Sequence, residues 1–350
     1  MLTCLAYRTT PHAPREISMK LYVVRPLATG VVAAAICVTA MPAVVHAQSA
    51  AGYPNKPIRF IDGFPAGGGT DYLARVIGQK LTNRFGQLVI VDNRPGAAGN
   101  VGAEIAAKGT PDGYTLMMGL TSTLAPSPSL YPRLPYNVMR DFEFVTLVAS
   151  GTYVLLVHPS VPAKSVSELV ALAKSKPGQI RYGSSGVAGP LHLAAELLKT
   201  RTGADMLHVP YKGAAPVVAA VTAGEVQVGF ASLAAALPLI KAGRLTALAV
   251  TSAKRAQAFP ELPTIAESGF PGFDITPRYG VLAPASTPSA IVKLLNSEIG
   301  KILQQPDIQT MFASQGLEAT GSTPEQFRNI MQAEIAQWAK VIRDANIKAD

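Results

Sequence analysis

Short apolar runs of strand length alternate with amphipathic helical segments along most of this chain. Such alternation is typical of an α/β fold with largely parallel sheets. The sequence therefore predicts helices flanking mostly parallel sheets. The nine apolar runs cover residues 58–64, 88–94, 115–120, 153–158, 180–185, 206–211, 226–231, 246–251 and 279–284.

Nine strands are more than one small sheet needs, so we expect two lobes. The chain has no Gly/Ser-rich linker, and we place its crossings between lobes inside strand-like segments near residues 148–154 and 275–280. Lobe 1 is then expected to contain residues 48–150 and 278–350, and lobe 2 residues 151–277.

Helix signals support this pattern in the intervening segments. An apolar stripe runs from Leu73 to Phe85 at helical spacing. Ser165 and Glu168 have the spacing of a capping box. A third helix is expected to start at Thr323 and Pro324 and to continue as an apolar stripe.

The first 47 residues differ in character from the rest. Lys20 and Arg25 precede the uncharged run "PLATGVVAAAICVTAMPAVVHA", which ends in a suitable cleavage sequence before Gln48. This pattern predicts a signal peptide over residues 1–47, with Met19 as an alternative start, and hence export of the mature chain. An uncleaved anchor is the alternative, because the run approaches the length of a membrane span.

Composition excludes several kinds of site. Cys4 and Cys37 both lie in the expected signal peptide, so the mature chain has no thiol for a disulfide, a metal or a nucleophile. Removing residues 1–47 takes away four basic residues and one acidic residue, which lowers the formal charge from +9 to +6. The remaining bases are scattered, so we expect no nucleic-acid partner. We also expect no metal or cofactor, because metal-ligand spacing is absent among His158, His192 and His208.

The stretch "PAGGGTD" joins the first expected strand to the first expected helix. Ligands of parallel sheets sit beyond the carboxyl ends of strands, and glycines there let backbone N–H groups approach them. We expect Thr70 to cap the helix, whose N-terminus favours an anion, and Asp71 to pair with Arg75. A turn that needs glycine for shape alone is the alternative. Nucleotide loops are excluded, because Gly-Lys-Ser/Thr is missing and Tyr72 occupies the place of the third dinucleotide glycine.

The stretch "YGSSGVAGPLHLAAELL" repeats this design after a later strand. Ser184, Ser185 and Gly186 turn the corner, and their hydroxyl and N–H groups suit a carboxylate or a phosphate. Lys212, in "HVPYKGAAP", is a further candidate for neutralising an acid. A secreted α/β hydrolase acting on a small anionic ester, with Ser185 as nucleophile and His192 as base, is the alternative function, although the last glycine of Gly-x-Ser-x-Gly is absent.

Eight motifs together resemble the Bug family, the periplasmic solute receptors of tripartite tricarboxylate transporters. The likeness runs from about Tyr53 to the C-terminus. The motifs are "GGGTDYLAR", "NRPGAAGNVGAE", "PDGYTLMMG", "YGSSGVAGPLHLAAELL", "HVPYKGAAP", "GRLTALAVTS", "ELPTIAESGFPGF" and "LAPASTP".

This resemblance implies a two-lobed periplasmic-binding fold of the second type, with two crossover segments. A ligand carboxylate would lie between the lobes, held by main-chain groups and partly through water. Carried over by position, the ligand-binding residues are Ala66, Gly68, Gly69, Thr70, Ser122, Thr123, Ser184, Ser185, Gly186, Ala231 and Ser232.

Two positions depart from the family pattern. Ala231 stands where members commonly carry Asp or Asn, and Arg278 stands where many carry Trp. An arginine at a cleft edge can bind a second carboxylate through two hydrogen bonds. We therefore add Arg278 to the expected site and expect a dicarboxylate, a tricarboxylate or an aromatic acid as ligand.

The implied function is solute capture without catalytic residues. A monomer would bind a small carboxylate and deliver it to the membrane subunits of a tripartite transporter. The effector domain of a transcription regulator can share this fold, but the export signal argues against that role.

Overall fold

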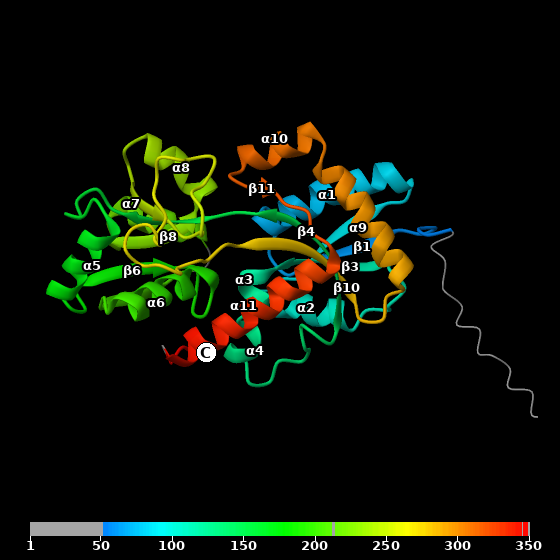
Figure 1. Ribbon diagram of the computed structural model, residues 1–350, viewed down its shortest axis with the longest axis horizontal. Coiled ribbons are helices and arrows are strands. Elements are labelled where there is room, and N and C mark those ends of the chain that lie inside the picture. Colours follow the sequence, from blue (N-terminus) through cyan, green and yellow to red (C-terminus); the bar gives the residue numbers. More distant parts are fainter. Residues whose placement is uncertain (1–51, 212–213, 345, 349–350) are drawn as a thin grey trace, which may run out of the picture. The chain divides into compact units, whose positions relative to one another are not determined.

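The computed structural model describes residues 52–211, 214–344 and 346–348 (Figure 1). All described residues lie in one compact unit, Ala47–Asp350. The expected signal peptide and Lys212 lie outside the described residues.

Six strands form sheet A, in the order β11-β4-β10-β3-β1-β2. Strand β1 pairs in parallel with β2 and β3, whereas β10 is antiparallel to β3 and β4, and β11 is antiparallel to β4. The strands are β1 (Ile58–Asp62), β2 (Val89–Asn93), β3 (Thr115–Leu120), β4 (Phe142–Ser150), β10 (Arg278–Pro284) and β11 (Glu318–Ala319).

Five strands form sheet B, in the order β7-β6-β8-β5-β9. Strand β6 pairs in parallel with β7 and β8, whereas β5 is antiparallel to β8 and β9. The strands are β5 (Tyr153–Val157), β6 (Ile180–Ser184), β7 (Met206–Pro210), β8 (Val228–Ser232) and β9 (Thr246–Val250).

The nine expected strands are confirmed, and most strands of each sheet run in one direction, as expected. The exceptions are β10 and β11 in sheet A and β5 in sheet B, so both sheets are mixed. Strands β5 and β10 are the ones that enter a sheet from the other sheet. Each therefore begins at the edge where its neighbours end, and runs against them. Sequence analysis also missed β4 and the two-residue β11.

The chain crosses between the sheets twice. Strand β4 ends at Ser150 and β5 begins at Tyr153, and the return runs from the end of β9 to β10 (Figure 1). Thr251, fully buried, joins the two crossings: its Oγ1 donates to the Ile275 carbonyl at 2.7 Å and accepts from the Tyr153 N–H at 3.2 Å. These bonds hold both crossing segments against the end of β9.

Helices cover both faces of each sheet. Apolar residues of α1, α9 and α10 pack with Val145 and Val281, while those of α11 pack with Phe144 and Leu282 on the opposite face. In sheet B, α6 and α7 lie on opposite sides of β6 and β8 (Figure 1). The helices are α1 (Gly69–Phe85), α2 (Asn100–Ala107), α3 (Thr121–Leu124), α4 (Ser127–Leu130), α5 (Val166–Ser175), α6 (Pro190–Thr202), α7 (Ala214–Ala223), α8 (Leu233–Lys241), α9 (Ser289–Leu303), α10 (Pro306–Ser314) and α11 (Pro324–Asp344), with a 3-10 turn η1 at Ala97–Gly99.

Two expected helix starts are confirmed by their caps. The Ser165 hydroxyl accepts a bond from the Glu168 N–H at 3.2 Å, and the Thr323 hydroxyl accepts one from the Gln326 N–H at 3.1 Å. Among the described residues, no helix combines the length and apolar character needed to span a bilayer.

Candidate functional site

The corner between β1 and α1, residues 63–69, presents its backbone to solvent. Ala66, Gly68 and Gly69 are exposed. Helix α1 begins at Gly69 with Gly68 as its N-cap, and no side chain bonds its first turn. This glycine corner therefore offers an uncapped helix N-terminus, whose free N–H groups and partial positive charge attract anions.

Thr70 does not cap this helix, contrary to the sequence prediction. It is buried, and its hydroxyl donates to Asp62 Oδ2 at 3.2 Å. Asp62 is the fully buried last residue of β1, and it also accepts bonds from the Asn93 side chain and the Phe64 N–H. Burial raises the pKa of Asp62 to about 6, although the hydrogen bond from Thr70 opposes this. The Thr70 hydroxyl thus bonds to Asp62 beneath the corner and does not cap the helix.

The expected pair between Asp71 and Arg75 is confirmed, with a distance of 2.8 Å. Asp71 also accepts bonds from the Gly67 N–H at 2.9 Å and from the Asn93 side chain at 3.0 Å. Although burial opposes it, bonds from Arg75 and Gly67 lower the pKa of Asp71. The ionised carboxylate therefore fixes the shape of the glycine corner.

A second corner, Ser184–Gly189, joins β6 to α6. The Ser184 hydroxyl is fully buried and lies 2.6 Å from His208 Nε2, so it is turned inward. Ser185 is half-buried, and its hydroxyl has no hydrogen bond within the described part of the chain. Gly186 has a φ of +125°, a conformation that favours glycine. The Ser185 hydroxyl and the corner's backbone are thus the groups that a ligand could reach.

Two stacked imidazoles support the Ser184–Gly189 corner. The rings of His192 and His208 lie 4.0 Å apart and within 7° of parallel, and Tyr182 stacks on His208 at 4.9 Å. His192 Nδ1 accepts a bond from the Ala188 N–H at 2.9 Å, so this nitrogen carries no proton. Burial lowers the pKa of His208. Neutral histidines therefore hold this corner in place.

The corner between β3 and α3 contains Ser122 and Thr123, both buried. The Ser122 hydroxyl lies 3.3 Å from the hydroxyl of Tyr153, the first residue of β5. The Thr123 hydroxyl donates to the Leu120 carbonyl at 2.9 Å, so it is already used. Tyr153 is in turn the pairing partner of Ser232 on β8.

Ala231 and Ser232, both expected in the site, have different surroundings in the structure. Ala231 is fully buried in an apolar cluster with Val154 and Leu156, and its expected contact with a ligand stays a prediction. Ser232 is half-buried and caps α8, accepting a bond from the Ala235 N–H at 3.4 Å. The alternation of side chains along a strand places these neighbours on opposite faces.

Sequence analysis missed the two tyrosines that connect these corners. Tyr279, on β10, pairs with Leu120, the residue before α3. A Cβ atom placed on Gly69 would lie 3.2 Å from the Tyr279 hydroxyl oxygen. The tyrosine stood at the start of an expected strand, but no local signal shows that this strand lies beside β3.

The structure thus brings together some of the expected residues. Tyr153 and Tyr279 link Gly69, Ser122 and Ser232. Within the part of the chain that the structure describes, no recorded hydrogen bond or ion pair connects the Ser184–Gly189 corner with the glycine corner.

Arg278 is engaged inside the protein. Its guanidinium lies 2.5 Å from Glu334 on α11 and 3.8 Å from Asp274. The two partners of the closer pair are 25% and 12% exposed, so this ion pair is largely shielded from water. Burial raises the pKa of Glu334, while the nearby Arg278 opposes that rise. A ligand carboxylate would have to compete with Glu334 for this arginine.

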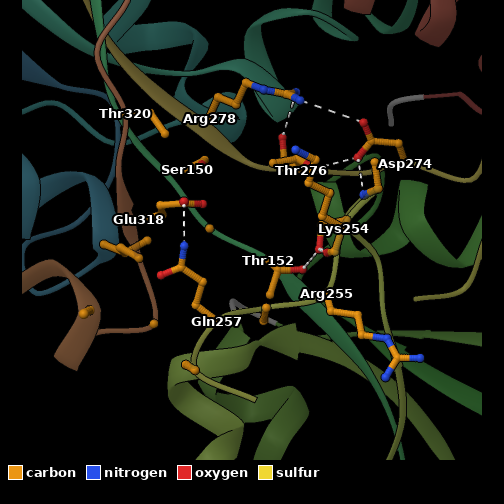
Figure 2. Close-up of a pocket in the computed structure, with 18 of the residues that line it drawn as sticks. Ser150, Thr152, Lys254, Arg255, Gln257, Asp274, Thr276, Arg278, Glu318 and Thr320 are labelled. Carbon is orange, nitrogen blue, oxygen red and sulfur yellow. Dashed lines mark hydrogen bonds and ion pairs between the residues drawn. The ribbon is translucent and has the colours of Figure 1, made fainter. Parts of the chain in front are cut away.

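A cavity of about 500 Å³ lies beside the two crossings. Figure 2 shows it between β11 on one side and the segment after β9 on the other, where Gln257 Nε2 donates to Glu318 Oε1 at 3.1 Å. Of the expected site residues, Arg278 alone contributes to its lining. Since β10 and β4 separate β3 from β11 in sheet A, the cavity lies on the β11 side of the crossings and the glycine corner on the β1 side.

The family described as "Tripartite tricarboxylate transporter family receptor" matches residues 73–347. The chain belongs to this receptor family. BugT from Bordetella pertussis is 39% identical over 301 residues, which is 86% of this chain and 92% of that protein. The resemblance to Bug receptors is therefore confirmed, and the chain has the solute-binding role of its family.

Two solved relatives of this receptor confirm its fold class. R. palustris Rpa4515 with adipate is 36% identical, with a TM-score of 0.77 over 85% of this chain and 100% of that one. MatC from Rhodopseudomonas palustris, with bound malate, is 28% identical, with a TM-score of 0.74 over 83% of this chain and 100% of that one. The receptor therefore has the two-lobed α/β fold of periplasmic binding proteins.

The alternative of a secreted hydrolase is not supported. Ser184, rather than the expected Ser185, lies next to a histidine, and Ser184 is fully buried. A nucleophile must be within reach of both its base and the substrate. The receptor's relatives are solute-binding proteins.

Proposed function

We propose that this receptor captures a small organic carboxylate without chemical conversion. The observation that carries this proposal is the uncapped N-terminus of α1, which ends in an exposed glycine backbone at the carboxyl end of β1. Relatives with adipate and malate support a carboxylate as the ligand class.

In this proposal the ligand lies between a lobe of residues 48–150 and 278–350 and a lobe of residues 151–277. The backbone of the glycine corner binds one carboxylate, because a helix N-terminus presents several N–H groups at once. The Ser184–Gly189 corner contributes backbone N–H groups and the Ser185 hydroxyl from the other lobe. Ser122, Thr123 and Ser232 line the remaining sides of the site. The ligand is a dicarboxylate, a tricarboxylate or an aromatic acid.

The same proposal includes export and delivery. Residues 1–47 act as a cleaved signal peptide, the mature protein is a periplasmic monomer, and membrane subunits of a tripartite transporter receive the ligand. N-terminal sequencing of the exported protein tests the first step, since a mature chain that does not begin near Gln48 contradicts it.

A thermal-shift screen of carboxylic acids tests the binding function. A ligand at 100 times its dissociation constant adds about 2.7 kcal/mol to the free energy of unfolding. The corresponding carboxamides serve as controls, because they lack the anionic oxygens. If no acid raises the melting temperature above its carboxamide, the proposed function is wrong.

Gly68→Asp provides a matched variant. Gly68 has the extended backbone of an N-cap, and a Cβ there would meet only the Pro65 carbonyl oxygen, at 3.5 Å. Aspartate is a favourable N-cap residue and bears its own anion. We expect Gly68→Asp to keep or raise the melting temperature of the ligand-free protein while abolishing the shift caused by acids. If acids raise the melting temperature of Gly68→Asp as much as that of the wild type, the ligand binds elsewhere.

A further inference from the structure

We propose that the Tyr279 hydroxyl donates a hydrogen bond to the ligand carboxylate at the glycine corner and favours acids over their carboxamides. This assignment rests on the proposed function and extends it to a residue outside the expected site. It makes Tyr279 a specificity-determining residue.

The backbone places the tyrosine next to the helix N-terminus. The pairing of Tyr279 with Leu120 fixes β10 beside β3. Gly69 has no side chain, so the Tyr279 phenol lies close to the first turn of α1. A Cβ atom placed on Gly69 would lie 3.2 Å from the Tyr279 hydroxyl oxygen. A ligand oxygen that accepts from this first turn therefore lies within reach of the phenol.

The hydroxyl has no partner of its own. Within the described residues, the structure records no hydrogen bond to Tyr279 Oη and no acceptor for the N–H groups of Gly68 and Gly69. Gly68 and Gly69 are exposed and Tyr279 is half-buried, so a ligand can reach all three donors, and a carboxylate oxygen can accept from them. Tyr153, by contrast, already shares its hydroxyl with Ser122.

The state of the phenol and the surrounding charges favour donation. Burial raises the pKa of Tyr279 to about 12, so the hydroxyl keeps its proton at neutral pH. Arg75, on α1, pairs with Asp71, and Arg278, the residue before Tyr279, pairs with Glu334. The anion would thus be held by neutral donors. In a carboxamide, an N–H₂ group replaces one of the two acceptor oxygens. This group cannot accept hydrogen bonds from these donors, so the carboxamide makes fewer bonds.

Tyr279→Phe tests the assignment, because it removes the hydroxyl and keeps the ring. The measurement is the dissociation constant for adipate, malate, adipamide and malamide by calorimetry at neutral pH. We expect the variant to bind the acids at least about 10-fold more weakly, because hydrogen bonds to charged groups are strong. The preference for acid over amide should fall by a similar factor.

Tyr72→Phe is the matched control. Tyr72 also lies on α1, but its exposed hydroxyl bonds to the Met311 carbonyl at 3.3 Å. This variant should bind like the wild type. Equal melting temperatures of the ligand-free proteins show that Tyr279→Phe folds normally.

The outcomes separate the two claims. If the wild type binds no acid of the thermal-shift screen, the proposed function fails and the assignment fails with it. If the wild type binds an acid and Tyr279→Phe binds it equally well, or loses acid and amide binding to the same extent, the assignment alone is overturned.

Discussion

At the scale of single residues, several polar side chains near the expected site are used by the protein itself. Thr70 bonds to the buried Asp62, and Ser184 lies against His208. Ser185 keeps a free hydroxyl among the described residues. A polar residue next to a glycine-rich corner can therefore support the corner without contacting a ligand. Residue type alone does not distinguish these roles.

Arg278→Ala should destabilise the protein. The change leaves the largely buried Glu334 without its closest cation, which costs about 3 kcal/mol in the free energy of unfolding. Urea denaturation measures this loss. Because Glu334 engages the guanidinium, we expect affinities for a diacid and for its monoacid analogue to change equally.

Arg255→Ala is the control for this prediction. Arg255 pairs with Glu267 at 2.9 Å, and both side chains are exposed, so little change in stability is expected. A selective loss of diacid binding in Arg278→Ala would show that the ligand displaces Glu334 from the arginine.

At the scale of elements, the two binding corners are held differently. An aspartate fixes the glycine corner through the Gly67 N–H, whereas histidines from α6 and β7 support the Ser184–Gly189 corner. The pKa of Asp71 is lowered by its bonds to Arg75 and Gly67 although burial opposes this, so Asp71 remains ionised over the physiological pH range, whereas histidines titrate within it. The Ser184–Gly189 corner should therefore be the acid-sensitive one.

His208→Phe should reduce the acid sensitivity of folding. Burial lowers the pKa of His208 in the folded state, so its contribution to stability is present above about pH 6.5 and is lost as the pH falls. The charged and titratable groups near it are Tyr182, His192, Glu196 and Lys199. The variant should have a flatter stability profile below about pH 6.5. It should also have about 1 kcal/mol less stability at neutral pH because the Ser184 bond is lost.

Urea titrations at several pH values measure this effect. His158→Asn is the control, since His158 bonds the nearby Ser160 and should leave the profile unchanged. The raised pKa of Asp62 has the opposite effect on the pH dependence of stability. Asp62 is present in all variants, so its effect cancels in the comparison. Identical profiles for His208→Phe and the wild type would contradict the prediction.

At the scale of the whole molecule, the crossings decide which corners can share a ligand. The chain leaves sheet A after β4 and returns through β10, so the edge residues Tyr153 and Tyr279 belong to strands that begin at the crossings. They therefore contact the corners where neighbouring strands end. The cavity on the β11 side depends on the same crossings.

Thr251→Val tests how firmly the crossings are joined. The change keeps the side-chain shape but removes a hydroxyl that bonds Ile275 and Tyr153 in a fully buried position. We expect a loss of about 2 kcal/mol in the free energy of unfolding, because two buried backbone groups lose a partner. Thr310→Val, on the exposed face of α10, should change it by less than about 0.5 kcal/mol. Equal effects of both changes would show that Thr251 does not join the crossings.

The positions of nine strands, of two helix caps and of the corners after β1 and β6 follow from the sequence alone. These features depend on neighbours a few residues apart: apolar runs mark β1 and β6, and Ser165 and Thr323 cap their helices within the same turn. Strand β11 has no such local signal, because its two residues gain their order from pairing with β4.

Three features depend on tertiary contacts: the direction of β5 and β10, the bond of Thr70 to the buried Asp62, and the approach of Tyr279 to Gly69. Gly69 and Tyr279 are far apart along the chain and meet because the return crossing inserts β10 beside β3. Contacts of that kind depend on the order of strands in a sheet, which local periodicity does not encode.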